Sequence, residues 1–120
     1  MSLWTEPQRR SVKVDLERFR DYEHFHDSVE QYVDLEIPQF VEVRWEPIKK
    51  FLIPLDGDQE EEEAFVQSVA DRIEADVDVP PILLDQGEVF DGRHRAWAAY
   101  ALRMKKVPVA EIGQYWTSRR

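Results

Sequence analysis

The ten residues from Val89 to Ala98 constrain the fold of this chain more than any other stretch of its sequence. They begin with residues that favour a β-strand, and the Asp91-Gly92 pair that follows is typical of a tight turn. Glycine at this point lets the backbone pass close to another segment. The residues from Ala96 to Met104 are almost all good helix formers. The stretch therefore predicts a strand that turns at a glycine and enters a helix at once.

Three basic side chains stand at the start of this expected helix. Arg93, His94 and Arg95 directly follow the glycine, where the first N–H groups of a helix lack backbone partners and the helix dipole is positive. Cations at that end oppose the dipole, so they cost stability unless an anion is sometimes bound. Backbone donors and cationic side chains that converge on one point can hold a phosphate group. We therefore expect a phosphate-binding site at Gly92, Arg93, His94 and Arg95.

The composition indicates one compact domain. The 120 residues are 42% hydrophobic, which is enough to form a core. No apolar run approaches the roughly 20 residues that a membrane span needs, and the N-terminus does not resemble a secretory signal. We therefore expect a cytoplasmic protein with no membrane partner. The chain has no cysteine, which excludes disulfides, thiol catalysis and thiolate metal sites.

Charge is unevenly distributed along the chain, whose net charge is −9. Residues 1–40 carry nine acids and five bases (−4), residues 41–78 carry twelve acids and four bases (−8), and residues 79–120 carry four acids and seven bases (+3). An acidic surface disfavours binding to a nucleic-acid backbone, so duplex DNA is not an expected partner. A basic pocket in an acidic protein suits a small anionic ligand. The alternative is that these charge blocks are solvated faces without a ligand.

Residues 1–40 are expected to form an N-terminal extension that packs on the rest of the chain. Residues 4–14 show no period and predict an irregular lead-in. From Asp15 to Pro38, apolar residues recur every three or four positions, which predicts an amphipathic helix of about five turns. Its aromatic stripe favours core or interface packing. We expect a homodimer, if one forms, to use this helix or the C-terminal tail with Tyr115 and Trp116.

Residues 41–120 are expected to form an α+β domain. An amphipathic helix should begin after the N-cap residue Asp58 and end near Ala75. Alternating or clustered apolar residues between turns predict four strands, at Phe40–Trp45, Ile82–Leu84, Glu88–Phe90 and Val107–Ile112. Pro108 favours an edge or terminal position for the last strand, because proline cannot donate to a sheet ladder. The predicted architecture is a small mixed sheet packed with helices.

The helix after Asp58 contributes two further candidate site residues. Ser68 and Arg72 lie one turn apart at the edge of its apolar stripe, where they could line a pocket. The acidic run from Gln59 to Glu63 is better explained as helix-start chemistry than as a metal site, since the helix dipole favours carboxylates there. We therefore assign no metal site to this acidic run.

Residues from about Pro47 to Ile112, a little over half of the chain, resemble the ParB/sulfiredoxin-like superfamily. Four runs match in order and spacing: FVQSVADRI at 65–73, VPPI at 79–82, FDGRHR at 90–95 and AAY at 98–100. Sulfiredoxins have a similar helix, a similar Val-Pro-Pro-Ile entry to a strand, and a Phe-Gly-Gly-Cys-His-Arg phosphate loop followed by Ala-Ala-Tyr. ParB-type proteins have a Gly-x-x-Arg-x-x-Ala box, which Gly92, Arg95 and Ala98 satisfy.

This resemblance implies roles for individual residues. In sulfiredoxins, the histidine and arginine of the loop bind ATP phosphates, and a serine of the preceding helix touches the nucleotide. The matching positions here are His94, Arg95 and Ser68, so the implied ligand is ATP or another nucleotide, with Mg²⁺. Two other binding positions differ, because Arg72 replaces a threonine and Phe65 replaces a lysine.

The chain also departs from the redox part of the family pattern. Arg93 replaces the catalytic cysteine of the loop, and Ile53 replaces an arginine that precedes a Pro-Leu pair. Without cysteine, we expect no sulfiredoxin activity. Other relatives differ in use: chromosome-partition ParB proteins bind CTP and carry a DNA-reading domain, and some free-standing members are kinases of free serine with a similar loop. We expect no DNA-reading domain after Ile112.

Three functions remain open from the sequence. The first is a domain that binds a nucleotide or another phosphate-bearing ligand, with phosphoryl transfer or nucleotide hydrolysis left open. Such chemistry would need Mg²⁺ and a base, and Asp91 is the candidate for either role; alternatively, Asp91 is a turn residue that caps the helix. The second is a non-catalytic interaction or dimerisation module on the same fold. The third is a ParB-like nucleic-acid-processing protein, which the charge balance disfavours.

Overall fold

The structure is a computed structural model that describes residues 2–5, 10–19, 22 and 39–113. Its centre is a five-stranded sheet in the order β1-β2-β5-β3-β4, in which only β3 and β5 run parallel. The described elements, in chain order, are β1 (Val12–Asp15), the 3-10 helix η1 (Leu16–Phe19), β2 (Phe40–Pro47), the 3-10 helix η2 (Ile48–Phe51), α2 (Gln59–Glu74), β3 (Ile82–Asp85), β4 (Glu88–Asp91), α3 (Arg93–Ala101) and β5 (Lys106–Glu111). The predicted α+β class, with a mixed sheet and helices, is confirmed.

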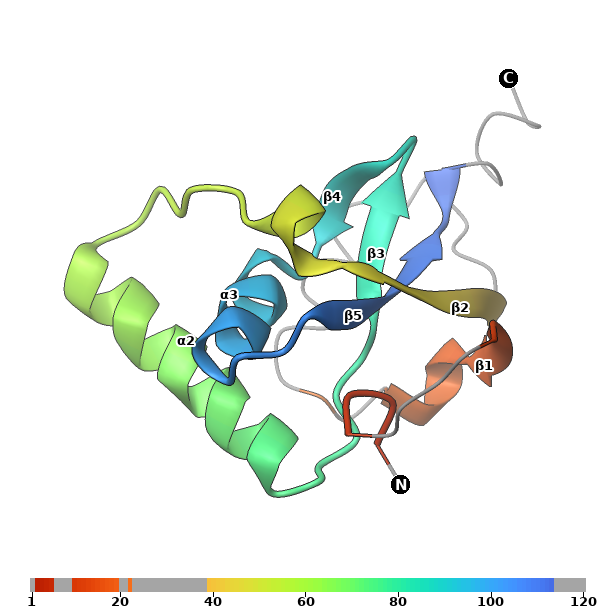
Figure 1. Ribbon diagram of the computed structural model, residues 1–120, viewed down its shortest axis with the longest axis horizontal. Coiled ribbons are helices and arrows are strands. Elements are labelled where there is room, and N and C mark those ends of the chain that lie inside the picture. Colours follow the sequence, from red (N-terminus) through yellow and green to blue (C-terminus); the bar gives the residue numbers. More distant parts are fainter. Residues whose placement is uncertain (1, 6–9, 20–21, 23–38, 114–120) are drawn as a thin grey trace.

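The two α-helices lie side by side next to the sheet (Figure 1). In α3, the buried positions include Ala96, Ala98 and Ala99, whose small side chains let the helix lie close to its neighbours. On β2, Val41 and Val43 are buried as their period-two alternation predicted, and Trp45 on the same face is half-buried. The core is continuous from the sheet into both helices. Packing against the sheet therefore determines where the first turn of α3 lies.

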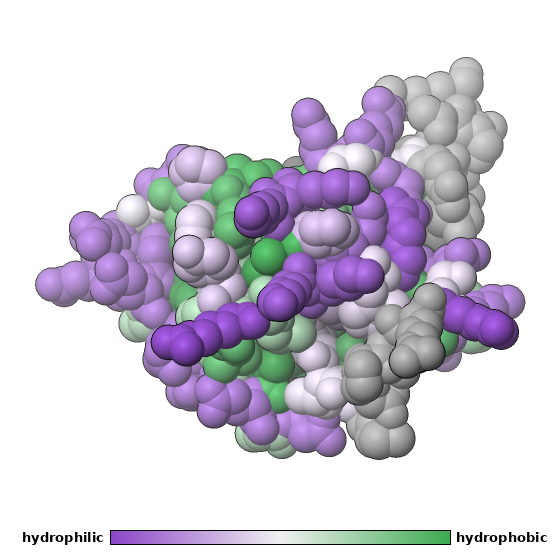
Figure 2. All heavy atoms as spheres, in the orientation of Figure 1, coloured by the Kyte–Doolittle hydropathy of each residue, from purple (hydrophilic) through white to green (hydrophobic). Residues whose placement is uncertain are grey.

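Helix α2 has the limits that its sequence predicts. The side chain of Asp58 caps it by accepting a hydrogen bond from the backbone N–H of Glu61 at 3.1 Å. Ala75 closes the helix as its C-cap, and Asp76 then turns the chain with a φ of 59°. Figure 2 shows hydrophilic side chains over the outer end of α2, with apolar side chains reaching the surface closer to the centre of the molecule. Local sequence chemistry is therefore enough to place this helix.

The N-terminal segment differs from the prediction. Residues 12–15 form strand β1 rather than an irregular lead-in, and Val12 lies opposite Val43 of β2. Asp15 ends this strand instead of beginning a long helix, and the short helix η1 follows it. The rest of the predicted helix, apart from Tyr22, lies outside the described residues, as does the tail with Tyr115 and Trp116.

Leu3 and Trp4 also belong to the core. The side chain of Trp4 is buried, and its indole N–H lies 3.0 Å from the carbonyl oxygen of Val79 and 3.1 Å from that of Pro80. The carbonyl of Leu3 accepts a hydrogen bond from the indole of Trp45 at 3.3 Å. Two anchors in an irregular segment produce no periodic pattern, so periodicity could not reveal them.

Strand β5 is an interior strand, so the expected edge position for Pro108 is wrong. Pro108 lies opposite Trp45 of β2, and the pairing with β3 begins one residue later, where Val109 lies opposite Ile82. At Pro108 the strand is therefore paired on one side only. This local opening explains how the sheet accommodates a residue without a backbone N–H.

Candidate functional site

The candidate site begins at Gly92, which connects β4 to α3. Gly92 has a φ of 117°, a left-handed conformation that side chains rarely adopt. A Cβ atom at this position would lie 3.1 Å from Nη1 of Arg95 and 3.2 Å from the backbone Cα of Ile82. The glycine therefore permits both the turn and the close approach of β3, as the sequence predicted.

Arg95 lies beneath this turn and makes contacts inside the protein. Only 4% of the residue is exposed. Its Nη1 donates to the carbonyl oxygen of Pro81 at 2.9 Å, and its Nη2 donates to Oδ2 of Asp91 at 3.0 Å. The guanidinium thus ties the start of α3 to the segment before β3 and to the end of β4. These contacts make Arg95 a residue that positions the loop, and its expected contact with a phosphate stays a prediction.

Asp91 is the last residue of β4, and its carboxylate accepts the hydrogen bond from Arg95. The N-cap position of α3 is occupied by Gly92, which supplies no side-chain cap. The alternative role of Asp91 as a turn residue that caps the helix stays a prediction. Its role as a base or magnesium ligand stays a prediction.

His94 connects the first turn of α3 to the first part of α2. Its Nε2 lies 2.7 Å from Oε2 of Glu62, a distance at which the ring N–H donates to the carboxylate. The imidazole also packs on the ring of Phe65, with centroids 4.3 Å apart and the planes tilted by 46°. Glu62 is a site residue whose acidic side chain the sequence explained only by the helix dipole. Glu62 lies one turn before Val66 on the apolar stripe of α2, and this position is the signal that could have placed it beside α3.

Arg93 is the basic residue of the loop that reaches solvent. Its side chain is 48% exposed, and Nη1 lies 3.7 Å from Oδ2 of Asp56, whose side chain is 89% exposed. An ion pair with such an exposed carboxylate is weak, because water and salt screen it and both side chains must be ordered. Arg93 is therefore available to a ligand that offers a stronger negative charge.

Ser68 and Arg72 lie on α2 beyond Phe65. Ser68 is exposed, and Arg72 is half-buried with its guanidinium carbon 5.4 Å from the centre of the Tyr22 ring. The guanidinium carbon of Arg95 lies 5.5 Å from the same ring. Tyr22 therefore lies near both Arg72 and Arg95, an arrangement that no sequence signal could have indicated. The Tyr22 hydroxyl is buried and has no hydrogen-bond partner among the described residues.

The charges of the loop are matched by nearby carboxylates. Arg93 faces Asp56, His94 faces Glu62, and Arg95 faces Asp91. These acids offset the loss of stability that cations cause at a helix start. A bound anion is therefore not needed for stability, contrary to what we expected from the sequence. What distinguishes the site is the combination of a helix start at an N-cap glycine with one exposed, loosely paired arginine.

The chain matches no protein-family model, and a search of curated proteins finds no match either. The resemblance to the ParB/sulfiredoxin-like superfamily therefore stays a prediction. In the described part of the chain, no three side chains of the His, Cys, Asp or Glu type are grouped so that they could hold a metal ion. None of the described helices has both the length and the apolar character needed to cross a membrane.

Proposed function

We propose that the chain binds a phosphate-bearing small ligand, such as a nucleotide, at the start of α3. The observation that carries this proposal is the first turn of α3, which begins after an N-cap glycine, Gly92, and has Arg93 beside it, 48% exposed. The first N–H groups of a helix are donors without helical partners, and the dipole adds positive potential. A phosphate at this point would accept hydrogen bonds from the backbone and from Arg93.

The ligand would replace Asp56 as the partner of Arg93. Asp56 is held only by a 3.7 Å contact in a highly exposed position, whereas a phosphate offers more charge and several acceptor oxygens. Arg72 on α2 supplies a second cation for a longer phosphate chain, and Ser68 one turn earlier supplies a hydroxyl. This arrangement favours a nucleoside di- or triphosphate over a single phosphate.

His94 and Arg95 act mainly by fixing the loop in this proposal. Their contacts to Glu62 and to Pro81 and Asp91 hold the first turn of α3 in place. Phosphoryl transfer would further require Mg²⁺, ligated largely by phosphate oxygens and water, and a base directed at an acceptor. Asp91 is engaged by Arg95, so the proposed function is binding and includes no chemical step.

Isothermal titration calorimetry tests this proposal directly. Wild-type protein is titrated with ATP, ADP and CTP, each with Mg²⁺, and with inorganic phosphate. We expect saturable binding of a nucleotide with one site per chain, weaker binding of phosphate alone, and affinity that falls as salt is added. The absence of saturable heat for every nucleotide and for phosphate would overturn the proposal.

A matched pair of variants separates a specific site from general attraction of anions. Arg93→Gln removes the proposed contact, and we expect about a tenfold loss of nucleotide affinity, as for a lost charge-assisted hydrogen bond. Lys105→Gln removes the same charge beyond the other end of α3, where Lys105 is exposed, and should leave the affinity nearly unchanged. An equal loss in both variants would mean that net charge alone attracts the ligand.

A further inference from the structure

A hollow lies between α2, α3 and the segment that leads into α2. It has a volume of about 650 Å³, within the range of roughly 300–1,000 Å³ typical of small-molecule sites. Its lining is mainly apolar and includes Leu55, Val66, Trp97 and Tyr100, together with the carboxylates of Glu62 and Glu63. The phosphate-binding proposal uses none of these side chains as a ligand contact, so this hollow calls for its own explanation.

Two aromatic rings form one corner of the hollow. Trp97 and Tyr100 pack edge to face, with ring centroids 5.8 Å apart and an angle of 77° between the planes. The indole N–H of Trp97 donates to the carbonyl oxygen of Ile53 at 2.7 Å, which fixes the orientation of the ring. Tyr100 is 56% exposed although it is a large aromatic residue. The corner is therefore rigid and open to a ligand.

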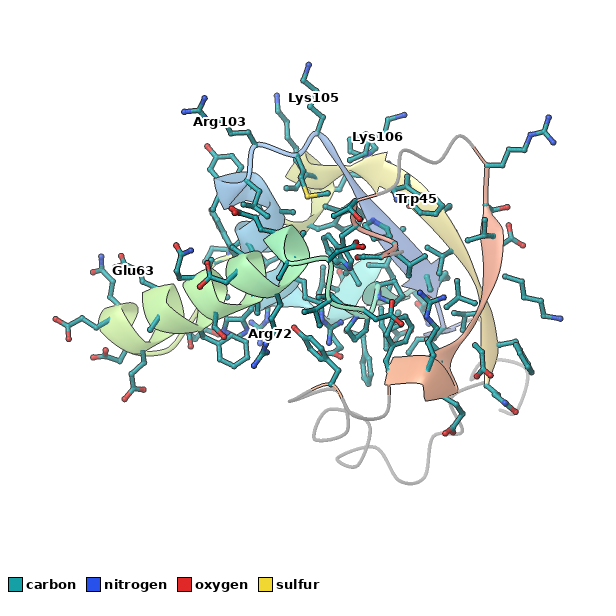
Figure 3. All side chains as sticks on the ribbon, turned by 90° about the horizontal axis from the view of Figure 1, so that it is seen from below. Trp45, Glu63, Arg72, Arg103, Lys105 and Lys106 are labelled. Atoms are coloured by element: carbon teal, nitrogen blue, oxygen red, sulfur yellow. The ribbon has the colours of Figure 1, made fainter. Side chains whose placement is uncertain are left out.

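The charge of the hollow has one sign. Its lining contains two carboxylates and, among the described residues, no lysine or arginine. Glu62 is held by His94, whereas Glu63 accepts a hydrogen bond from the neutral amide of Gln59 at 3.1 Å, a contact that brings no opposite charge. Figure 3 shows Glu63 on the outer part of α2. The carboxylate of Glu63 therefore supplies negative potential at the mouth of the hollow, near Trp97 and Tyr100.

One group of basic residues lies on the other side of Tyr100. A neighbouring hollow of about 570 Å³, which shares Tyr100 and Ala101 with the first, is lined by Lys49, Arg103 and Lys105. Figure 3 shows Arg103 and Lys105 grouped beyond the end of α3, away from Glu63. The exposed ring of Tyr100 thus separates an acidic hollow from a basic one, which gives the acidic hollow a defined preference for cations.

We propose that the acidic hollow binds a small organic cation, of the alkylammonium or quaternary ammonium class. The faces of aromatic rings attract such cations through the ring quadrupole, and Trp and Tyr are the strongest partners. The methyl or methylene groups of the ligand would pack on Leu55 and Val66, while Glu63 would balance its charge. This site adjoins the start of α3 through Glu62, the partner of His94, but the proposal does not depend on the phosphate ligand.

Choline and its neutral analogue 3,3-dimethyl-1-butanol test the proposal, because the two have nearly the same shape and differ in charge. Each is titrated into ¹⁵N-labelled protein at constant ionic strength and followed in ¹H–¹⁵N spectra. We expect saturable shifts at the indole N–H of Trp97 and at the amides of residues 97–101 with choline. The analogue should bind about tenfold more weakly. Equal affinity for the two, or no saturable shift with choline, would overturn the proposal.

Matched variants then locate the site. Tyr100→Ala should weaken choline binding about tenfold, whereas Tyr100→Phe keeps the ring and should bind nearly as well as wild type. Phe40 is a comparably exposed aromatic residue (46%) on β2, so Phe40→Ala serves as the control and should have no effect. Loss of binding in Phe40→Ala, or full binding in Tyr100→Ala, would contradict the location.

The choline titration also tests the role of charge in the hollow and the independence of the hollow from the start of α3. Glu63→Gln should weaken choline binding about threefold, while Glu60→Gln, one turn earlier on α2 and outside the hollow, should not. Arg93→Gln should leave choline binding intact although it weakens nucleotide binding. A loss of choline binding in Arg93→Gln would show that the hollow and the start of α3 act as one site and would refute the separate cation site.

Discussion

Glu62 and His94 are joined by a 2.7 Å contact between Oε2 and Nε2, although 32 residues separate them in the sequence. The contact ties the acidic start of α2 to the basic start of α3. On the next turn of α2, the ring of Phe65 packs on the same imidazole at 4.3 Å. The electrostatic character of the candidate phosphate site therefore depends on a carboxylate that belongs to another helix.

Removing this carboxylate should strengthen anion binding. We expect Glu62→Gln to raise the affinity for inorganic phosphate about threefold, because a negative charge beside the site is lost while a hydrogen-bonding side chain remains. The measurement is calorimetric titration with phosphate at low salt. Glu60→Gln changes the net charge equally without contacting His94 and should have a smaller effect. A lower affinity in Glu62→Gln would mean that Glu62 supports the bound state.

Arg95 should contribute more to stability than any exposed basic residue. Its guanidinium is buried between the carbonyl of Pro81 and the carboxylate of Asp91. We expect Arg95→Ala to lower the free energy of unfolding by about 3 kcal/mol, since it removes a buried cation and its bonds to the Pro81 carbonyl and the half-buried Asp91 carboxylate. Arg95→Lys should lie in between, because one ammonium cannot reproduce the fork of the guanidinium.

Urea unfolding measures the effect of these Arg95 variants, with Lys105→Gln as a control that should match wild type. A stable Arg95→Ala variant that no longer binds nucleotide would identify Arg95 as a ligand contact instead of a structural one.

Trp4 should be essential to the stability of the domain although it lies near the N-terminus. The residue is 3% exposed, and its indole N–H contacts the carbonyl oxygens of Val79 and Pro80. We expect Trp4→Ala to lower the free energy of unfolding by about 3–5 kcal/mol, the usual cost of truncating a buried large aromatic residue. Thr5→Val, at the exposed neighbouring position, should cost much less. Unchanged urea denaturation of Trp4→Ala would contradict the docking of this segment.

Asp76 should make stability depend on pH. Hydrogen bonds from the hydroxyl of Thr5 at 2.7 Å and from the backbone N–H of Ser2 at 3.1 Å lower the pKa of the Asp76 carboxyl below its ordinary value of 3.8. A carboxyl with a lowered pKa in the folded state stabilises the fold above its ordinary pKa. This contribution is lost as the pH falls through the folded-state pKa.

Thermal unfolding of Asp76→Asn between about pH 7 and about pH 2 checks this dependence. Asparagine tolerates the positive φ of this position. We expect the variant to melt below wild type at neutral pH and the difference to narrow once the pH drops below 3.8. Glu74→Gln, at an exposed site on α2, should show no such convergence. A difference that stays constant down to the lowest pH would refute the role of the ionised carboxylate.

Features that depend on neighbouring residues in the sequence were predictable. The N-cap at Asp58, the limits of α2, the alternation along β2 and the glycine turn into α3 were all read correctly. Each follows from short-range rules of capping, periodicity and backbone conformation. The exception is β1, because a strand of four residues beside an irregular segment carries too little pattern to be recognised.

The sequence by itself therefore determined the α+β class, the main elements and the convergence of Arg93, His94 and Arg95 on one helix start. Only the tertiary structure decided how these three side chains differ. Arg95 is buried under Gly92, His94 is held by Glu62, and Arg93 reaches solvent beside a highly exposed carboxylate. Their partners come from distant segments, and a partner brought close only by folding leaves no periodic signal along the chain.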